Sequence, residues 1–135
     1  MSVIVTDSGF AAEDWTAGFV ALANLGAHQG AVDLVNTDDP EALRDVLGDL
    51  RLIRVDFPAF NDGRAFTIAR RLRLMGYKGR LRAKGHVIAD QYAMTRRVGF
   101  DEVEISADLA ARQPAEQWAF RADWQAHDYQ ARLRA

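Results

Sequence analysis

The sequence predicts a single α/β domain over residues 1–135, with a mainly parallel sheet of about five strands and a helical, aromatic C-terminal tail. Short apolar runs alternate with longer segments whose apolar residues recur at helical spacing, and glycine, proline or aspartate marks the junctions. This alternation is typical of right-handed βαβ units, which build flavodoxin-like sheets or part of a β/α barrel. A chain of 135 residues is long enough to bury one hydrophobic core.

The first half of the chain begins with a predicted strand at residues 3–5 and a helix over residues 12–25 that ends at Gly26. The apolar stripe of this helix is Trp15, Phe19, Leu22 and Ala23. A second strand covers residues 32–35. Proline at position 40, directly after Asp39, predicts the start of the next helix.

The second half continues the alternation. It contains predicted strands over residues 52–57, 80–84 and 102–105, and helices over residues 62–75 and 87–98. Asp62 is a suitable N-cap for the first of these helices. The tail beyond Pro114 carries four aromatic residues, namely Trp118, Phe120, Trp124 and Tyr129. We expect them to cover one face of the sheet, with a homodimer joined through the tail as the second interpretation.

Two of the predicted strands alternate charged and apolar residues, which is unusual for buried parallel strands. Arg80, Arg82 and Lys84 would lie on one face of the first, and Glu102 and Glu104 on one face of the second. Either these are edge strands with a solvated face, or the face is an incomplete β/α wall that docks a partner. The second interpretation makes Arg80, Arg82 and Lys84 partner-binding residues.

Charge is distributed unevenly, although the formal net charge is only −2. Residues 1–63 contain three Lys/Arg against eleven Asp/Glu, whereas residues 64–97 contain ten Lys/Arg against one acid. The near-neutral total argues against nonspecific nucleic-acid binding by the whole surface. No apolar run approaches the ~20 residues that span a bilayer, so we expect a cytoplasmic protein. The chain has no cysteine, which excludes disulfides and cysteine-bound iron–sulfur or zinc centres.

Ligands of open α/β sheets gather beyond the carboxyl ends of the strands. The polar residues that the pattern places there form the candidate ligand-binding set: Asp62, Arg64, Lys84, His86 and Asp90. Cationic side chains near a helix N-terminus suit an anion. Standard hydrolase, metalloprotease and phosphate-loop motifs are missing, and the three histidines are scattered. We therefore assign no catalytic residue, metal or cofactor, and leave open whether the protein is an enzyme.

The central half of the chain resembles a known family. The similarity is carried in order and spacing by the segments FPAFNDGRA at residues 57–65, ARRLR at 69–73, GYKGRLRA at 76–83, GHV at 85–87, DQ at 90–91 and RVGFD at 97–101. The family is a group of small bacterial proteins catalogued as domain of unknown function nine-three-four. Its members are commonly encoded beside assimilatory sulfite reductase. The resemblance implies a role in sulfate assimilation, with no established biochemical activity.

Two functional hypotheses follow. In the first, the chain is an accessory protein of assimilatory sulfite reduction whose basic face meets an acidic surface on sulfite reductase or on its electron donor. Because the chain has no cysteine, it cannot itself hold the iron–sulfur cluster of a reductase. In the second, the chain is a small βα enzyme or an anion-binding module that acts on sulfite, sulfate or a phosphorylated metabolite.

Overall fold

The structure is a computed structural model of the 135-residue chain, and it describes residues 2–58, 63–85, 87, 89–113 and 118. The described part forms a seven-stranded sheet whose strands are β1 (Ser2–Thr6), β2 (Gly9–Ala11), β3 (Val20–Ala21), β4 (Ala31–Leu34), β5 (Leu52–Phe57), β6 (Arg80–Gly85) and β7 (Glu102–Ser106). The α-helices are α1 (Gly63–Leu74), α2 (Tyr92–Arg97) and α3 (Ala107–Arg112), and the 3₁₀ helices are η1 (Leu22–Ala27), η2 (Pro40–Asp49) and η3 (Ala89–Gln91).

The strand order is β2-β1-β7-β6-β5-β4-β3. Strands β3 to β7 are parallel to one another, and β1 pairs antiparallel with both β2 and β7. The parallel strands follow each other in chain order without a reversal. A flavodoxin-like sheet requires such a reversal, so that alternative is wrong. Consecutive order is the arrangement of a segment of a β/α barrel.

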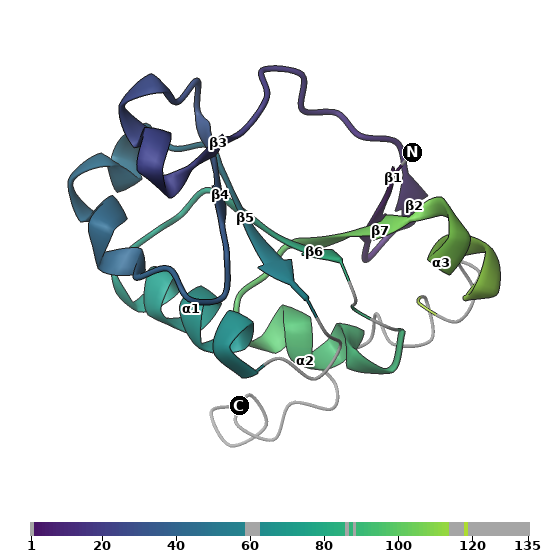
Figure 1. The fold of residues 1–135 in the computed structure, drawn as a ribbon. Helices are drawn as coiled ribbons and strands as arrows, with labels where there is room; N and C mark the ends of the chain where they lie inside the picture. Colours follow the sequence, from purple (N-terminus) through teal and green to yellow (C-terminus); the bar gives the residue numbers. More distant parts are fainter. Residues whose placement is uncertain (1, 59–62, 86, 88, 114–117, 119–135) are drawn as a thin grey trace.

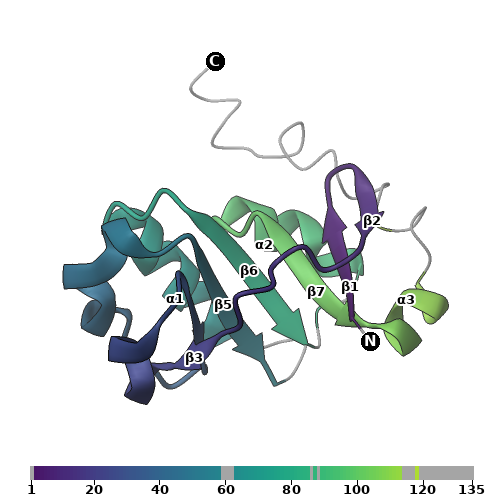
Figure 2. The same ribbon diagram turned by 90° about the horizontal axis from the view of Figure 1, so that it is seen from above.

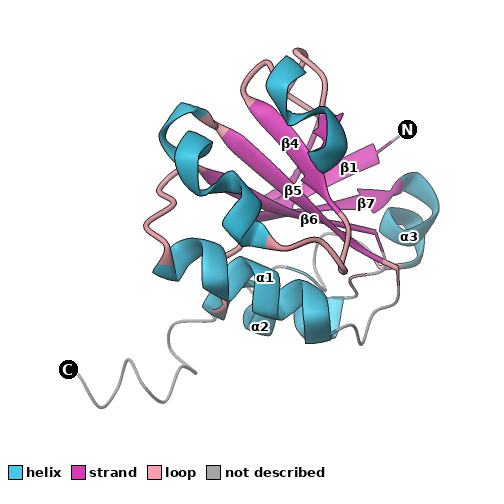
Figure 3. Ribbon diagram, turned by 60° about the vertical axis from the view of Figure 1, so that its left-hand side comes forward, coloured by secondary structure: helices cyan, strands magenta, loops and turns pink. Residues whose placement is uncertain are grey.

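Helices α1 and α2 lie side by side on one face of the sheet (Figures 1 and 3). The sheet residues that face them are apolar, and the registers place Val32, Ile53, Leu81 and Val55, Ala83, Val103 in rows across the strands. Phe57 joins the two layers, since its ring contacts Phe66 edge-on at 5.1 Å and Phe100 at 5.7 Å between centroids. This single face therefore contains the hydrophobic core.

No α-helix of the described chain covers the opposite face. There, the connection between β2 and β3 crosses over the strands, as the view from above shows (Figure 2). We call this connection, residues 12–19, the strap. The predicted helix over residues 12–25 is wrong, because the strap is neither helix nor strand and η1 begins only at Leu22. Gly18 has a φ of 80° and its carbonyl accepts from the Trp15 indole, a local turn that a helix cannot contain.

The other predicted elements are close to the observed ones. Asp39 caps the segment that starts at Pro40 by accepting from the Glu41 N–H, although η2 is a 3₁₀ helix. The predicted helix over residues 87–98 is shortened to η3 and α2. Trp118 is buried and packs edge-on against Tyr92. The remaining tail aromatics, Phe120, Trp124 and Tyr129, lie outside the described residues.

Candidate functional site

The uncovered face of the sheet carries a row of charged residues across four strands. The parallel register aligns Asp33 on β4, Arg54 on β5, Arg82 on β6 and Glu102 on β7, with Glu104 one pleat further along β7. Strands β6 and β7 lie inside the sheet, so the expectation that they are solvated edge strands is wrong. We call these five residues the charged row.

Arg82 lies at the centre of the charged row and has no exposed surface. Its Nε donates to Glu102 at 2.7 Å and its Nη1 donates to Glu104 at 2.9 Å. Both carboxylates are themselves almost fully buried. Burial of a guanidinium is tolerated only when such charge-assisted hydrogen bonds replace its hydration.

The two flanking arginines are held in the same way. Arg54 forms a bidentate salt bridge with Asp33, in which Nε donates at 2.5 Å and Nη2 at 2.7 Å. Its Nη1 donates to Glu104 at 3.0 Å. Arg80 is about one-third exposed and donates to Glu102 from Nε at 3.0 Å and from Nη2 at 2.9 Å. Each arginine is therefore oriented by a carboxylate that belongs to the sheet.

The strap supplies a second set of partners from above. Glu13 binds Arg82 through both carboxylate oxygens at 2.5 and 3.0 Å, and Asp14 accepts from Arg80 at 2.9 Å. The Phe19 ring lies over the Arg54 guanidinium, 3.6 Å from ring centroid to Cζ. One strap residue thus engages each of the three arginines.

The pKa values of these groups reflect the pairing. For Glu104, burial raises the pKa, but the charge of Arg54 and hydrogen bonds from the neighbouring arginines bring it below its ordinary value of 4.5. Burial and the bond from Arg82 act in the same opposing way on Glu13, with a net lowering. The pKa of Asp14 is lowered chiefly by its hydrogen bond from Arg80. The arginines thus favour the ionised form of Glu104, Glu13 and Asp14.

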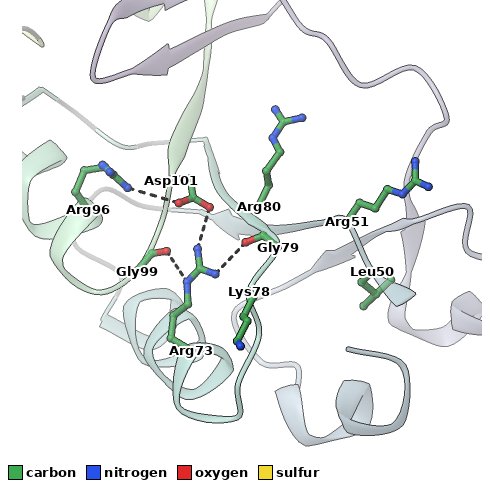
Figure 4. Close-up of a pocket in the computed structure, with 9 residues that line it drawn as sticks. All are labelled: Leu50, Arg51, Arg73, Lys78, Gly79, Arg80, Arg96, Gly99 and Asp101. Carbon is green, nitrogen blue, oxygen red and sulfur yellow. Dashed lines mark hydrogen bonds and ion pairs between the residues drawn. The ribbon is translucent and has the colours of Figure 1, made fainter. Parts of the chain in front are cut away.

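A hollow of about 800 Å³ opens at the amino ends of β5, β6 and β7 (Figure 4). Its floor is the Arg73 guanidinium, which donates to the carbonyls of Tyr77, Gly79 and Gly99 and to the Asp101 carboxylate. Together with Arg73, the cations that line the hollow are Arg51, Lys78, Arg80 and Arg96. We call this feature the basic hollow.

Arg51 and Lys78 differ from the other cations of the basic hollow. Both are exposed, and among the described residues neither side chain has a hydrogen-bond or ion-pair partner. In Figure 4 their side chains extend in different directions from the rim. Sequence reasoning missed this hollow because it searched the carboxyl ends of the strands. The available signal was the GYKGR segment, whose Lys78 and Arg80 flank a glycine directly before a strand.

The predicted ligand-binding set is only partly described. Asp62 and His86 lie outside the described residues, as does the side chain of Asp90, whose backbone is in η3. Arg64 is exposed in the first turn of α1, and Lys84 is half-buried on β6, in register with Asp56 and Glu104. The convergence of the five residues on one ligand therefore stays a prediction.

The predicted partner-binding face must be corrected in one respect. Arg82 has no exposed surface and Arg80 is paired with Glu102 and Asp14, so neither presents a free positive charge to solvent. The acids that neutralise them come from the strap and from β7. Only Lys84 of this set keeps its side chain outside the ion pairs described above.

Within the described ranges, no group of three or more metal-ligating side chains could hold an ion. No helix among these residues is long and apolar enough to cross a membrane.

The model of a bacterial family matches residues 31–135, from β4 to the end of the chain. The family is described as a bacterial protein of unknown function, DUF934. No curated protein and no solved structure matches the chain. The match covers β4 to β7 with their helices, whereas β1, β2, the strap and β3 precede it.

Proposed function

Because the chain belongs to the bacterial family DUF934, we propose that it is an accessory protein of assimilatory sulfite reduction that binds an acidic surface of a partner. The link to sulfite reduction rests on the resemblance described above. The proposed partner is sulfite reductase or its electron donor, and the proposed location of the protein is the cytoplasm. The contact surface moves, however, from the buried Arg82 to the basic hollow.

The observation that carries this proposal is the pair of exposed cations at the rim of the basic hollow. Arg51 and Lys78 line the same hollow, whose floor is Arg73; this arginine ties together the α1–β6 and α2–β7 connections, and the Arg80 N–H donates to the Arg51 carbonyl at 2.9 Å. Cations on such a floor attract an acidic surface over a distance of about one Debye length, ~8 Å at physiological salt.

The same geometry favours a protein surface over a small oxyanion. A small anion needs several donors that converge on one point. Arg51 and Lys78 extend in different directions (Figure 4), and Arg73 and Arg80 already donate to carbonyls or carboxylates. A broad acidic surface can satisfy separated cations without convergence.

The test is co-purification of sulfite reductase with the tagged chain, using an Arg51→Glu/Lys78→Glu variant. The matched control is Arg112→Glu, an exposed cation on α3 beyond the opposite end of β7. We expect the double variant to bind about tenfold more weakly, since each reversed rim charge changes the free energy by ~0.2–1 kcal/mol or somewhat more. The control should bind like the native chain.

Two further measurements complete this test. Binding should weaken from 0.05 to 0.5 M salt, as expected for exposed charges. Thermal shifts with sulfite, sulfate and phosphate test the anion-binding alternative, and stabilisation by any of them that depends on Lys78 would favour it. Equal recovery of the reductase with the native chain and the double variant would contradict the proposed surface.

A further inference from the structure

We propose that the three arginines of the uncovered sheet face form a binding site for a short acidic segment of a partner protein, and that the strap occupies this site in cis. The segment would carry two adjacent acidic residues and an aromatic residue five positions later, as Glu13, Asp14 and Phe19 do in the strap. This site does not include Arg51 or Lys78, the exposed cations on which the proposed function rests, although Arg80 lines both features.

The strap shows how such a segment is recognised. Its three contacts are the bidentate Glu13–Arg82 salt bridge, the Asp14–Arg80 salt bridge at 2.9 Å and the Phe19 ring over the Arg54 guanidinium. These contacts recognise two carboxylates and one aromatic face in a fixed order along the segment. They therefore define the chemistry of the ligand.

The strap is held weakly enough to be displaced. It contains no buried residue, and the side chains of Glu13 and Asp14 are 32% and 66% exposed. The Asp14–Arg80 pair joins two partly exposed side chains and stabilises by only ~0–1 kcal/mol. Arg82, the partner of Glu13, is fully buried but keeps its bonds to Glu102 and Glu104 when Glu13 leaves. At its two ends the strap continues into β2 and β3, strands of three and two residues, so it can lift as a loop while β1 stays paired with β7.

The site beneath the strap is formed without it. Arg82 keeps Glu102 and Glu104, Arg54 keeps Asp33 and Glu104, and Arg80 keeps Glu102 when the strap contacts are removed. Because these sheet carboxylates fix the guanidinium groups, a ligand loses little freedom of the receptor on binding. The edges of Arg80 and Arg82 that bind the strap remain directed at the same space.

The extent of the family points in the same direction. Arg54, Arg80 and Arg82 and their sheet carboxylates lie within residues 31–135, which the family model covers, whereas the whole strap precedes residue 31. The three arginines thus lie in the part of the chain that the family model matches, and the strap lies before that part.

The charge of the site favours a short acidic peptide over a polyphosphate or nucleic acid. Three arginines face Asp33, Glu102 and Glu104, so the site without the strap is close to neutral. A pair of carboxylates with an aromatic ring can be matched locally by hydrogen bonds and stacking. A chain of phosphates would meet the three sheet carboxylates as well, which is unfavourable.

The experiment uses the complete chain and a fluorescent peptide with the sequence of residues 11–20. Native protein should bind the peptide weakly, because the tethered strap competes at millimolar effective concentration. A Glu13→Gln/Asp14→Asn variant should bind it at least tenfold more tightly, since its own strap no longer competes. A peptide with the same two acid-to-amide changes should not bind. Glu41→Gln, which alters an exposed acid of η2, serves as the matched protein control.

A second measurement is independent of the stability of the double variant. Because the chain has no cysteine, Thr16→Cys accepts a single fluorescent label on the exposed strap. Saturating acidic peptide should increase the mobility of this label in the otherwise native chain. The proposal is overturned if the label does not respond, or if the amide peptide binds the double variant as tightly as the acidic one does. A dimer of the native chain that the strap substitutions abolish would also overturn it, because the occupant would then be a second copy.

Discussion

Replacement of Arg82 by methionine tests whether the charged row is an integral part of the fold. Methionine has a similar length and suits a buried position, but it carries no charge and no donor. The substitution removes the bonds to Glu102 at 2.7 Å and to Glu104 at 2.9 Å, and it leaves both carboxylates in place with almost no exposed surface.

The expected loss follows from what remains around those two carboxylates. Removing one partner of a buried ion pair destabilises by ~3–5 kcal/mol, because the other charge is left uncompensated. Here Glu102 retains Arg80 and Glu104 retains Arg54, which places the expected loss near the lower limit, about 3 kcal/mol. For a domain of this size that corresponds to a decrease in Tm of roughly 10 °C.

The assay is urea denaturation followed by tryptophan fluorescence, with circular dichroism as a second probe of two-state behaviour. Two controls bracket the result. Arg70→Met alters an exposed arginine of α1 and should change the free energy of unfolding by no more than about 0.5 kcal/mol. Glu13→Gln removes only the strap side of the Arg82 network and should cost less than about 1 kcal/mol. A loss below 1 kcal/mol for Arg82→Met would refute the buried network as a source of stability.

Three smaller perturbations test other parts of the structure. Gly76 and Gly85 both have positive φ angles, 99° and 112°. A Cβ added at Gly76 would meet no atom within 4 Å, whereas a Cβ added at Gly85 would lie 2.6 Å from a carbonyl oxygen of β5. Gly76→Ala should cost ~1–2 kcal/mol and Gly85→Ala clearly more, so equal urea midpoints would contradict this close approach. Arg73→Ala should destabilise by about 2 kcal/mol through the lost bonds to three carbonyls, whereas Arg70→Ala should be nearly neutral in the same assay. The pKa of Glu104 is lower in the folded protein than its ordinary value of 4.5. Its contribution to the free energy of unfolding is therefore complete above pH 4.5 and declines as the pH falls further. A Tm that stays constant from about pH 6 to about pH 3 would exclude this linkage.

The parallel strands could be predicted from the sequence because their signal is local. Apolar runs and regular alternation identify β4, β5, β6 and β7 with boundaries close to those observed. Helix α1 was predicted for the same reason, since Ala65, Ile68, Ala69 and Leu72 recur at helical spacing and are all buried. These patterns depend only on residues within one element.

The strap could not be predicted from periodicity. The spacing of Trp15, Phe19 and Leu22 is helical, but Glu13, Asp14 and Phe19 are held by arginines of two other strands. Such partners lie 35 residues away along the chain for Phe19 and 66 to 69 for the two acids, so a search for a local pattern cannot detect them. Tertiary pairing therefore overrides helix propensity in this segment.

The burial of Arg82 could be predicted by comparing the patterns of two consecutive strands. Arg80 and Arg82 alternate with apolar residues, and so do Glu102 and Glu104 in the next strand. If two consecutive strands are parallel neighbours, equal alternation places opposite charges side by side on one face. The matching pattern predicts a neutralised pair of strands rather than a basic surface, because the acids of one strand are within reach of the arginines of the other.

The consecutive order of the parallel strands explains why the arginines of the charged row are paired with carboxylates of the sheet itself. Crossovers of one hand place α1 and α2 on the same face, so the opposite face receives no α-helix from the described residues. A closed barrel would bury that face with further strands, but here the sheet ends in the antiparallel pair β1–β2 and stays open. A strap without buried residues cannot replace the missing layer. The arginines must therefore be neutralised within the plane of the sheet, and for that reason the cover above them can be exchanged without loss of the fold.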